Sequence, residues 1–285
     1  MGWFILCNRL FPQDMHSTAF LKRNHFPGAY KVAIYTGFRF QACPVQLIPH
    51  SHNKAEALVR ASGAYAEVAA VLGELPMLTW TGKSTQKKNV VAQAMLNAYI
   101  RERMKDCGWA IEHTIKKADK NSHVLDFYKE FTHPADGLAH RIGVEVEFGY
   151  HSRLDTDIRK FQSAYQRKCL DAGIIVCLVE EVAALTDSAV GSYEGLLAAL
   201  DDYTEDTITC PILAIGLSGR HTPVIDLSKS KYPDYASLTG ANSVEEKIRT
   251  VRAIQQGVPV ESLAPALTAS APRVRPAAVE QCLLF

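Results

Sequence analysis

SHVLDFYKE at residues 122–130 and RIGVEVEFG at residues 141–149 are the two stretches that decide the fold. Both are rich in β-branched and aromatic residues, which predicts two strands. A turn-rich connector, FTHPADGLAH at residues 131–140, joins them. Two strands joined by one such connector predict an antiparallel hairpin.

A helix and a buried strand are predicted directly after this hairpin. Leu154, Ile158, Phe161 and Tyr165 recur at spacings of four, three and four, which indicates an amphipathic helix over residues 154–169. The nearly continuous apolar run GIIVCLVE at residues 173–180 is typical of a strand covered on both faces of a sheet. Further along, we expect a helix over residues 193–200 and strands at PILAIGL (211–217) and TPVIDL (222–227).

The residues before the hairpin are mainly predicted to be helical. Apolar spacing indicates one helix over residues 54–72, a second over 90–107 and a short helical piece over 111–117. Residues 30–35 and 38–47 alternate like short strands. Together the elements predict an α/β fold, in the sense of an α+β mixed sheet flanked by helices, with a helical N-terminal region.

The chain is expected to divide into three parts. Residues 1–50 would be an N-terminal extension or peripheral strands, residues 51–257 the main domain, and residues 258–285 a flexible tail rich in Pro and Ala. With a formal net charge of +1, any surface that binds nucleic acid must gather its basic side chains on one face.

Several classes of protein lack their usual signals in this sequence. No apolar run has the length of a membrane helix, and the opening residues do not resemble a signal peptide, so we expect an intracellular protein without a membrane partner. The seven cysteines contain no CxxC pair, which argues against a structural zinc site. Walker, GxGxxG and GxSxG motifs are missing as well, so no nucleotide cofactor is expected.

Three acidic residues on the predicted hairpin form the candidate site. Glu145 and Glu147 stand two residues apart on the second strand and therefore point to one face, and pairing of the strands can bring Asp126 beside Glu145. Such carboxylates raise each other's pKa unless a cation lies among them, and an all-oxygen cluster suits Mg²⁺. Alternating Glu and Val is also typical of a half-solvated strand, so spacing leaves both interpretations open.

The run DFYKE…RIGVEVEFG…DIRKFQSAY…DAGIIVCLVE resembles the catalytic core of the BglII/BstYI-like group of type II restriction endonucleases, within the PD-(D/E)XK superfamily. In that group an Asp begins the hairpin, an E-x-(Q/E/K) triplet lies on its second strand, and a helix with a D-[IL]-x-[KA]-F core follows. The resemblance covers about residues 122–180. It implies a nuclease that uses Mg²⁺ to cut both strands of DNA at a short palindromic site, acting as a homodimer in the bacterial cytoplasm.

The resemblance also implies roles for individual residues. Asp126 and Glu145 would bind Mg²⁺ together with the backbone carbonyl of Val146. Glu147 stands where the group usually has Lys or Gln, and it would orient or deprotonate the attacking water. Because Glu lacks the positive charge of Lys, stabilisation of the transition state would depend more on metal ions.

Two further acids are weaker candidates. Asp136 in the connector is a rival for the role of Asp126, although Asp in an A-D-G sequence is typically a turn former. Glu112, on the short helix expected over residues 111–117, could support the site from a distance. A solvated helical Glu is the alternative explanation.

Lys87, Lys88 and Lys160 are the candidates for contact with DNA. The first two lie with Lys83 in a loop that opens a helix, where lysines, hydroxyls and helix amides can bind phosphate. Lys160 precedes Phe161 in the matched helix. A solvated basic loop is the alternative for the lysine pair. The rival functions are a repair or junction-resolving nuclease of the same superfamily and a non-catalytic DNA-binding protein on a nuclease fold.

Overall fold

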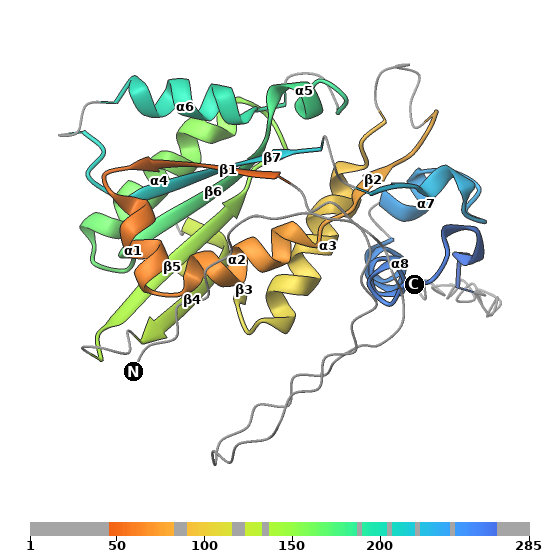
Figure 1. Cartoon of the computed structure of the whole chain (residues 1–285), viewed down its shortest axis with the longest axis horizontal. Coiled ribbons are helices and arrows are strands. Elements are labelled where there is room, and N and C mark those ends of the chain that lie inside the picture. Colours follow the sequence, from red (N-terminus) through yellow and green to blue (C-terminus); the bar gives the residue numbers. More distant parts are fainter. Residues whose placement is uncertain are drawn as a thin grey trace, which may run out of the picture. The chain divides into compact units, whose positions relative to one another are not determined.

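A six-stranded mixed sheet forms the centre of the protein in the computed structural model (Figure 1). The structure describes residues 46–82, 90–115, 123–132, 137–186, 190–203, 207–219, 223–239 and 243–266. The strand order is β1-β7-β6-β5-β4-β3, and β2 and β8 form a separate parallel pair. The strands are β1 Gln46–His52, β2 Met77–Thr79, β3 Ala110–Ile115, β4 His123–Thr132, β5 Ala139–Val146, β6 Ala172–Leu178, β7 Ile212–Ser218 and β8 Val224–Asp226.

The hairpin and the buried strands were correctly predicted. β4 pairs antiparallel with β5, with Phe127 opposite Val144. β5, β6 and β7 run parallel, and every residue of β6 and β7 is buried, as their apolar runs predict. Helix α4 (Ser152–Gln166) connects β5 to β6, and α6 (Tyr193–Asp201) lies between β6 and β7 in the chain. The mixed sheet confirms the predicted α/β fold.

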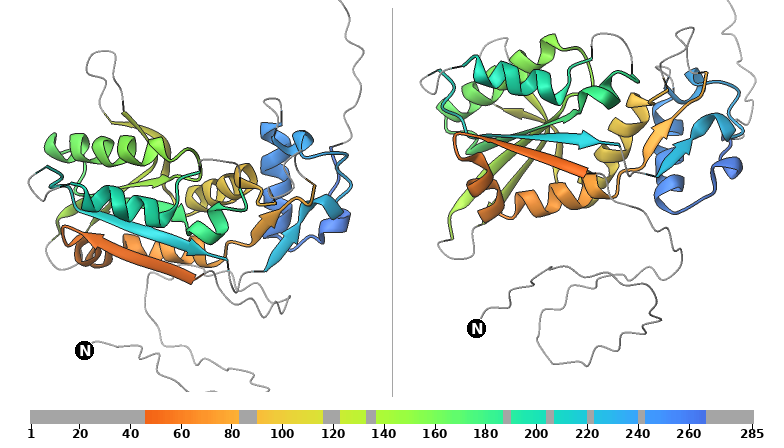
Figure 2. Two further views of the ribbon diagram at one scale, coloured as in Figure 1. Left: turned by 90° about the horizontal axis from the view of Figure 1, so that it is seen from above. Right: turned by 45° about the horizontal axis from the view of Figure 1, so that its top comes forward.

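Helices cover both faces of the sheet. Figure 2 shows α4 and α6 on one side and α1 (Ala55–Ala61) with α2 (Ala64–Gly73) on the other. Helices α3 (Gln93–Asp106) and α8 (Val244–Gln255) lie together at one end, near the β2–β8 pair (Figure 1). The short elements are α5 Glu180–Ala183, α7 Ala236–Thr239 and the 3₁₀ turns Leu227–Lys229 and Val260–Ser262.

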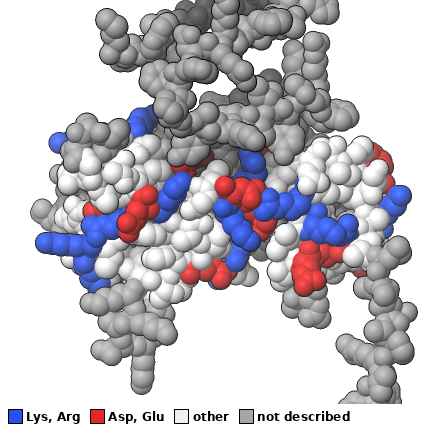
Figure 3. Space-filling view, turned by 90° about the horizontal axis from the view of Figure 1, so that it is seen from below, with Lys and Arg blue, Asp and Glu red and all other residues white. Residues whose placement is uncertain are grey.

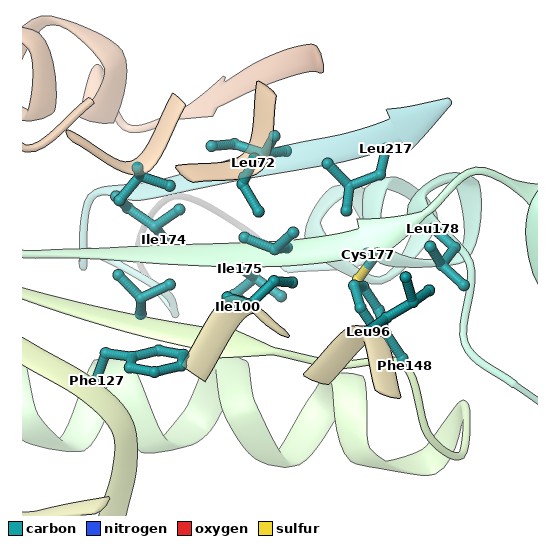
Figure 4. Packing of buried hydrophobic residues seen from close by; sticks show 14 of the residues in the cluster. Leu72, Leu96, Ile100, Phe127, Phe148, Ile174, Ile175, Cys177, Leu178 and Leu217 are labelled. Atoms are coloured by element: carbon teal, nitrogen blue, oxygen red, sulfur yellow. The ribbon is translucent and has the colours of Figure 1, made fainter. Parts of the chain in front are cut away.

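The hydrophobic core is continuous between these layers. In Figure 4, Leu72 of α2 and Leu96 and Ile100 of α3 pack around the central strand β6, which contributes Ile174 and Ile175. All five side chains are at most 2% exposed. Because the central strands are anchored on both faces, residues at the end of β5 are held on a rigid support.

Two helix predictions were wrong in detail. The single helix expected over residues 54–72 is divided into α1 and α2 at Gly63, whose φ of 90° cannot continue a helix. Residues 111–115 of the helix expected over 111–117 lie instead in strand β3, paired with β4, and residues 116–117 fall outside the described residues. Ile111, His113 and Ile115 are less exposed than their neighbours, and this period of two is the pattern of a strand.

The described residues at both ends of the expected main domain pack onto it. β1 pairs with β7 from Gln46 onward, so the boundary expected near residue 50 falls inside a strand of the main sheet. Residues 1–45 and 267–285, which include the strands expected over 30–35 and most of 38–47, lie outside the described residues. In the segment expected to start a flexible tail, Leu263 is buried and its carbonyl accepts a hydrogen bond from the backbone N–H of Lys231. Helix α8 was not anticipated. No helix in the described ranges combines the length and the apolar character needed to cross a membrane.

Gly173 of β6 should not tolerate a larger residue. A Cβ added there would lie 2.3 Å from Cδ2 of Phe161 on α4. We expect Gly173→Ala to lower the free energy of unfolding by about 1–3 kcal/mol, because overpacking a rigid core forces side chains from their preferred positions. The control is Gly73→Ala at the end of α2, where an added Cβ meets nothing within 4 Å.

Thermal unfolding of both variants and the parent protein measures the difference. Gly73→Ala should be neutral or stabilise by up to about 1 kcal/mol, since Ala is the better helix former. Equal unfolding midpoints for the two variants would contradict the close packing of α4 on β6.

Candidate active site

A cleft of about 900 Å³ lies where the ends of β4 and β5 meet α3, α4 and α8. Its lining includes the three predicted acids of the hairpin, Asp126, Glu145 and Glu147. Helix α4 adds Asp157 and Lys160. The structure therefore brings the predicted acids of β4 and β5 together in one cleft.

Asp126 lies at an interruption in the sheet. Within the described strands, the register of β4 with β3 skips Asp126 between Leu125 and Phe127, and the pairing of β4 with β5 ends at Phe127. Glu112, between the β3 residues paired with Phe127 and Leu125, has a φ of 51°, which is uncommon for a residue other than glycine. The Asp126 carboxylate accepts a hydrogen bond of 2.9 Å from the backbone N–H of Val146. This bond fixes Asp126 against the end of β5.

Glu145 and Glu147 are both buried and both line the cleft, with 4% and 7% of their surface exposed. Lys160 Nζ donates to Glu145 Oε1 at 2.8 Å. Glu147 accepts a hydrogen bond of 2.6 Å from the backbone N–H of Gly149. Both side chains line the same cleft, one from β5 and one from the residue after its end, as the spacing of two predicts.

Burial and crowding raise the pKa of all three carboxyl groups. Desolvation is the largest cause for each. The charges of Asp126 and Asp157 add to it and raise the pKa of Glu145 to about 8. The charge of Asp157 contributes to the rise of the Glu147 pKa to about 7. The site thus concentrates negative charge where water is scarce.

Asp157 is a site residue to which the sequence analysis assigned no role. It is 4% exposed, and its carboxylate lies 2.9 Å from Lys160 Nζ. The spacing of three residues on one helix could have suggested this pair. Its link to Glu145 through Lys160 could not be predicted, because α4 and β5 meet only in the folded protein.

The remaining candidates lie at the rim or outside the described residues. Glu112 lines the cleft from β3, where its side chain is 63% exposed and pairs with Arg101 at 2.6 Å. Asp136, Lys87 and Lys88 fall in ranges that the structure does not describe. Lys160, the third candidate for contact with DNA, lies inside the site with its side chain 14% exposed.

The oxygen atoms of the cleft fit a magnesium ion. Among the described residues, no three His, Cys, Asp or Glu side chains are grouped closely enough to hold a metal by themselves. Mg²⁺ needs fewer, because it is usually bound by one or two carboxylates completed by water and substrate phosphate. Asp126 and Glu145 supply two carboxylates and Val146 lines the same cleft. A cation there would also offset the repulsion that raises their pKa values.

Charges of both signs are interleaved on the protein surface. Figure 3 shows Lys and Arg side chains beside Asp and Glu side chains across one face, in place of a large patch of one sign. At the cleft, α3 contributes Arg101, α4 contributes Arg153 and α8 contributes Lys247. These basic groups surround the acidic centre, an arrangement compatible with a polyanionic ligand.

Comparisons with known proteins agree with this architecture. Residues 48–217 match the family model of restriction endonuclease BglII/BglIII. Among solved structures, the chain is similar to restriction endonuclease BglII complexed with a DNA 16-mer, at 17% sequence identity and a TM-score of 0.51. That similarity covers 64% of this chain and 77% of the other. No curated protein matches the sequence.

Glu145→Gln should stabilise the metal-free protein at alkaline pH. The folded state raises the pKa of Glu145 from 4.5 to about 8, so it keeps a proton that the unfolded chain loses. The resulting stability is fully present below about pH 4.5 and is lost as the pH rises through about 8. Between pH 5 and 9 in EDTA, the thermal unfolding midpoint of the parent protein should therefore fall by a few degrees relative to that of Glu145→Gln. A loss of 1 kcal/mol in the free energy of unfolding corresponds to about 2–4 °C.

Glu56→Gln is the control for this experiment, because Glu56 makes an exposed ion pair with Arg60 on α1. Its unfolding midpoint should follow that of the parent protein at each pH. A constant difference between Glu145→Gln and the parent protein over the same range would show that Glu145 does not titrate differently on folding.

Proposed function

The chain belongs to the BglII/BglIII restriction endonuclease family, and we propose that it uses Mg²⁺ to cut both strands of DNA at a short palindromic site. The family and the fold make it a type II restriction endonuclease, which is a DNA phosphodiester hydrolase. The observation that carries the finer proposal is the meeting of Asp126, Glu145 and Glu147 in one cleft. The interruption of the β3–β4 register at Asp126 and the burial of both glutamates support a site built for chemistry over a solvated strand.

Each hairpin residue would have a defined task in this reaction. Asp126, Glu145 and the backbone carbonyl of Val146 would hold Mg²⁺. When bound, Mg²⁺ would polarise the scissile phosphate and lower the pKa of the attacking water. Glu147 would orient that water and accept its proton. Glu112 would support the site from the rim of the cleft by holding Arg101 in place through their ion pair.

The proposed hydrolysis is an in-line displacement at phosphorus. The bond from the water oxygen to phosphorus forms while the bond from phosphorus to the 3′ oxygen breaks. The water proton passes to the Glu147 carboxylate, and the departing 3′ oxygen takes a proton from solvent. The products are a 5′-phosphate end and a 3′-hydroxyl end.

The proposed partner is double-stranded DNA, bound by a homodimer in the bacterial cytoplasm. The similar BglII structure contains a DNA 16-mer, which supports duplex DNA as the ligand. A palindromic site has two-fold symmetry, and a two-fold dimer presents one active site to each strand.

Purified protein should cut unmethylated plasmid or phage DNA into discrete fragments with Mg²⁺ and leave it intact with EDTA. Glu145→Ala should lower the cleavage rate by at least about 10²-fold, because the variant no longer makes an interaction that acts on the transition state. Sequencing the fragment ends gives the recognition site and the polarity of the cut. The Glu56→Gln protein serves as the active control.

Other outcomes would favour the rival functions. Cleavage confined to branched or nicked DNA would favour a repair or junction-resolving nuclease. Binding of duplex DNA without cleavage of any substrate would favour a non-catalytic DNA-binding protein.

Lys87 and Lys88 are proposed to contact DNA phosphates, as the sequence indicates. The double variant Lys87→Ala/Lys88→Ala should weaken binding of duplex DNA to a similar extent for different sequences. The slope of log K against log salt should become less steep by about 0.9 for each phosphate that the variant no longer neutralises. Binding isotherms in EDTA at several salt concentrations measure both quantities, and an unchanged slope would exclude both lysines as phosphate ligands.

A further inference from the structure

Lys160 of α4 places a buried cation inside the acidic site. Its Nζ lies 2.8 Å from Glu145 Oε1 and 2.9 Å from Asp157 Oδ1. The side chain of Lys160 is 14% exposed, and those of Glu145 and Asp157 are 5% and 6% exposed. Two ion pairs in a poorly solvated place hold the ammonium group in a defined position.

The neighbouring residue on the helix shows that this inward position is specific. Arg159 precedes Lys160, yet its side chain is 68% exposed and pairs with Asp155 on the outer surface of α4. A lysine that contacts the DNA backbone from the rim would be expected to be similarly accessible. Lys160 is instead directed at the strand that carries the catalytic carboxylates.

We propose that Lys160 is a catalytic residue that contacts the scissile phosphate during the reaction, and that Asp157 is the positioning residue that holds it there. This inference rests on the proposed function. The position two residues after Glu145 is occupied by Glu147, which cannot supply positive charge to the phosphate. Lys160 reaches the same site from a different element and supplies that charge.

The chemistry of an ammonium group fits this task. Lysine carries three N–H donors, and the contacts with Glu145 and Asp157 account for two of them. A phosphate beside Glu145 would lie within reach of the third. As water attacks, negative charge increases on the non-bridging phosphate oxygens, and a fixed cation in a buried site stabilises that charge strongly. No proton transfer to or from Lys160 is required.

Asp157 determines where the ammonium group lies. It stands three residues before Lys160, so both side chains share one face of α4. Asp157 forms an ion pair with the ammonium group from helix α4, and Glu145 forms a second one from strand β5. Removing the Asp157 charge would leave a single ion pair and allow Nζ to move away from its working position.

The test compares Lys160→Met with Lys129→Met. Lys129 on β4 is a matched control, because its Nζ is also part-buried and binds a carboxylate, Glu67, at 2.7 Å, and it does not line the cleft. In single-turnover cleavage at saturating DNA with Mg²⁺, Lys160→Met should react about 10²–10³-fold more slowly than the parent protein. Lys129→Met should lower the unfolding midpoint and leave the rate of the folded protein within about threefold, because its ion pair supports packing alone.

DNA affinity distinguishes a contact that Lys160 makes with the scissile phosphate during the reaction from a contact with a backbone phosphate that is already made when DNA binds. In EDTA, Lys160→Met should bind duplex DNA within about threefold of the parent protein, with an unchanged salt slope. A slope less steep by about 0.9, with an unchanged single-turnover rate, would overturn the proposal and make Lys160 an ordinary phosphate ligand.

Three milder variants keep the proposal testable if Lys160→Met does not fold. Lys160→Arg retains the charge and should cleave at least about tenfold faster than the neutral Lys160→Gln. Asp157→Asn should lower kcat by about tenfold with little change in KM, since the substrate still binds but the cation is poorly placed. Equal rates for Lys160→Arg and Lys160→Gln would overturn the proposal. A parent protein that cuts no DNA would instead overturn the proposed function on which it rests.

Discussion

The burial of several carboxylates at the end of β5 is the constraint on which the rest of the structure depends. Glu145, Glu147 and Asp157 are each at most 7% exposed, and desolvation disfavours the charged form of the two glutamates. Such a cluster lowers stability unless it is compensated. Hydrogen bonds from backbone N–H groups and the ammonium group of Lys160 provide part of that compensation. The remaining excess of negative charge favours binding of a further cation. A bound cation would offset the energetic cost of burying these carboxylates.

The packing of α4 on the sheet makes this compensation geometrically possible. Gly143 and Gly173 lie on neighbouring strands, and a Cβ at either position would collide with Phe161 or the leucines beside it. Their missing side chains let α4 approach β5 and β6 closely. At this separation Lys160 of α4 reaches Glu145 of β5. The rigid apolar strands, the two glycines and the buried cation therefore act as one unit.

The active-site cleft combines residues from the segment that matches the family with residues from helix α8, which lies outside that segment. Residues 48–217 match the family and contain the hairpin acids together with Asp157 and Lys160. Helix α8 follows this segment, yet Val244, Lys247 and Ile248 on one of its faces line the same cleft. Arg252 secures α8 to α3 through Glu102 and Asp106. The cleft is therefore built from residues both inside and outside the matched segment.

The sequence by itself determined the features that depend on local periodicity. The hairpin, the shared face of Glu145 and Glu147, and the buried strand β6 all follow from spacings of two or from continuous apolar runs, and the structure contains them. Where the local pattern is short or ambiguous, the prediction is wrong, as for residues 111–115, which lie in β3 and not in the predicted helix. The pairing of β1 with β7 and the contact of Lys160 with Glu145 join segments that are far apart in the chain. Only the tertiary structure decided these, because long-range pairing and the depth at which a charge is buried depend on how the layers pack and leave no periodic signal in the sequence.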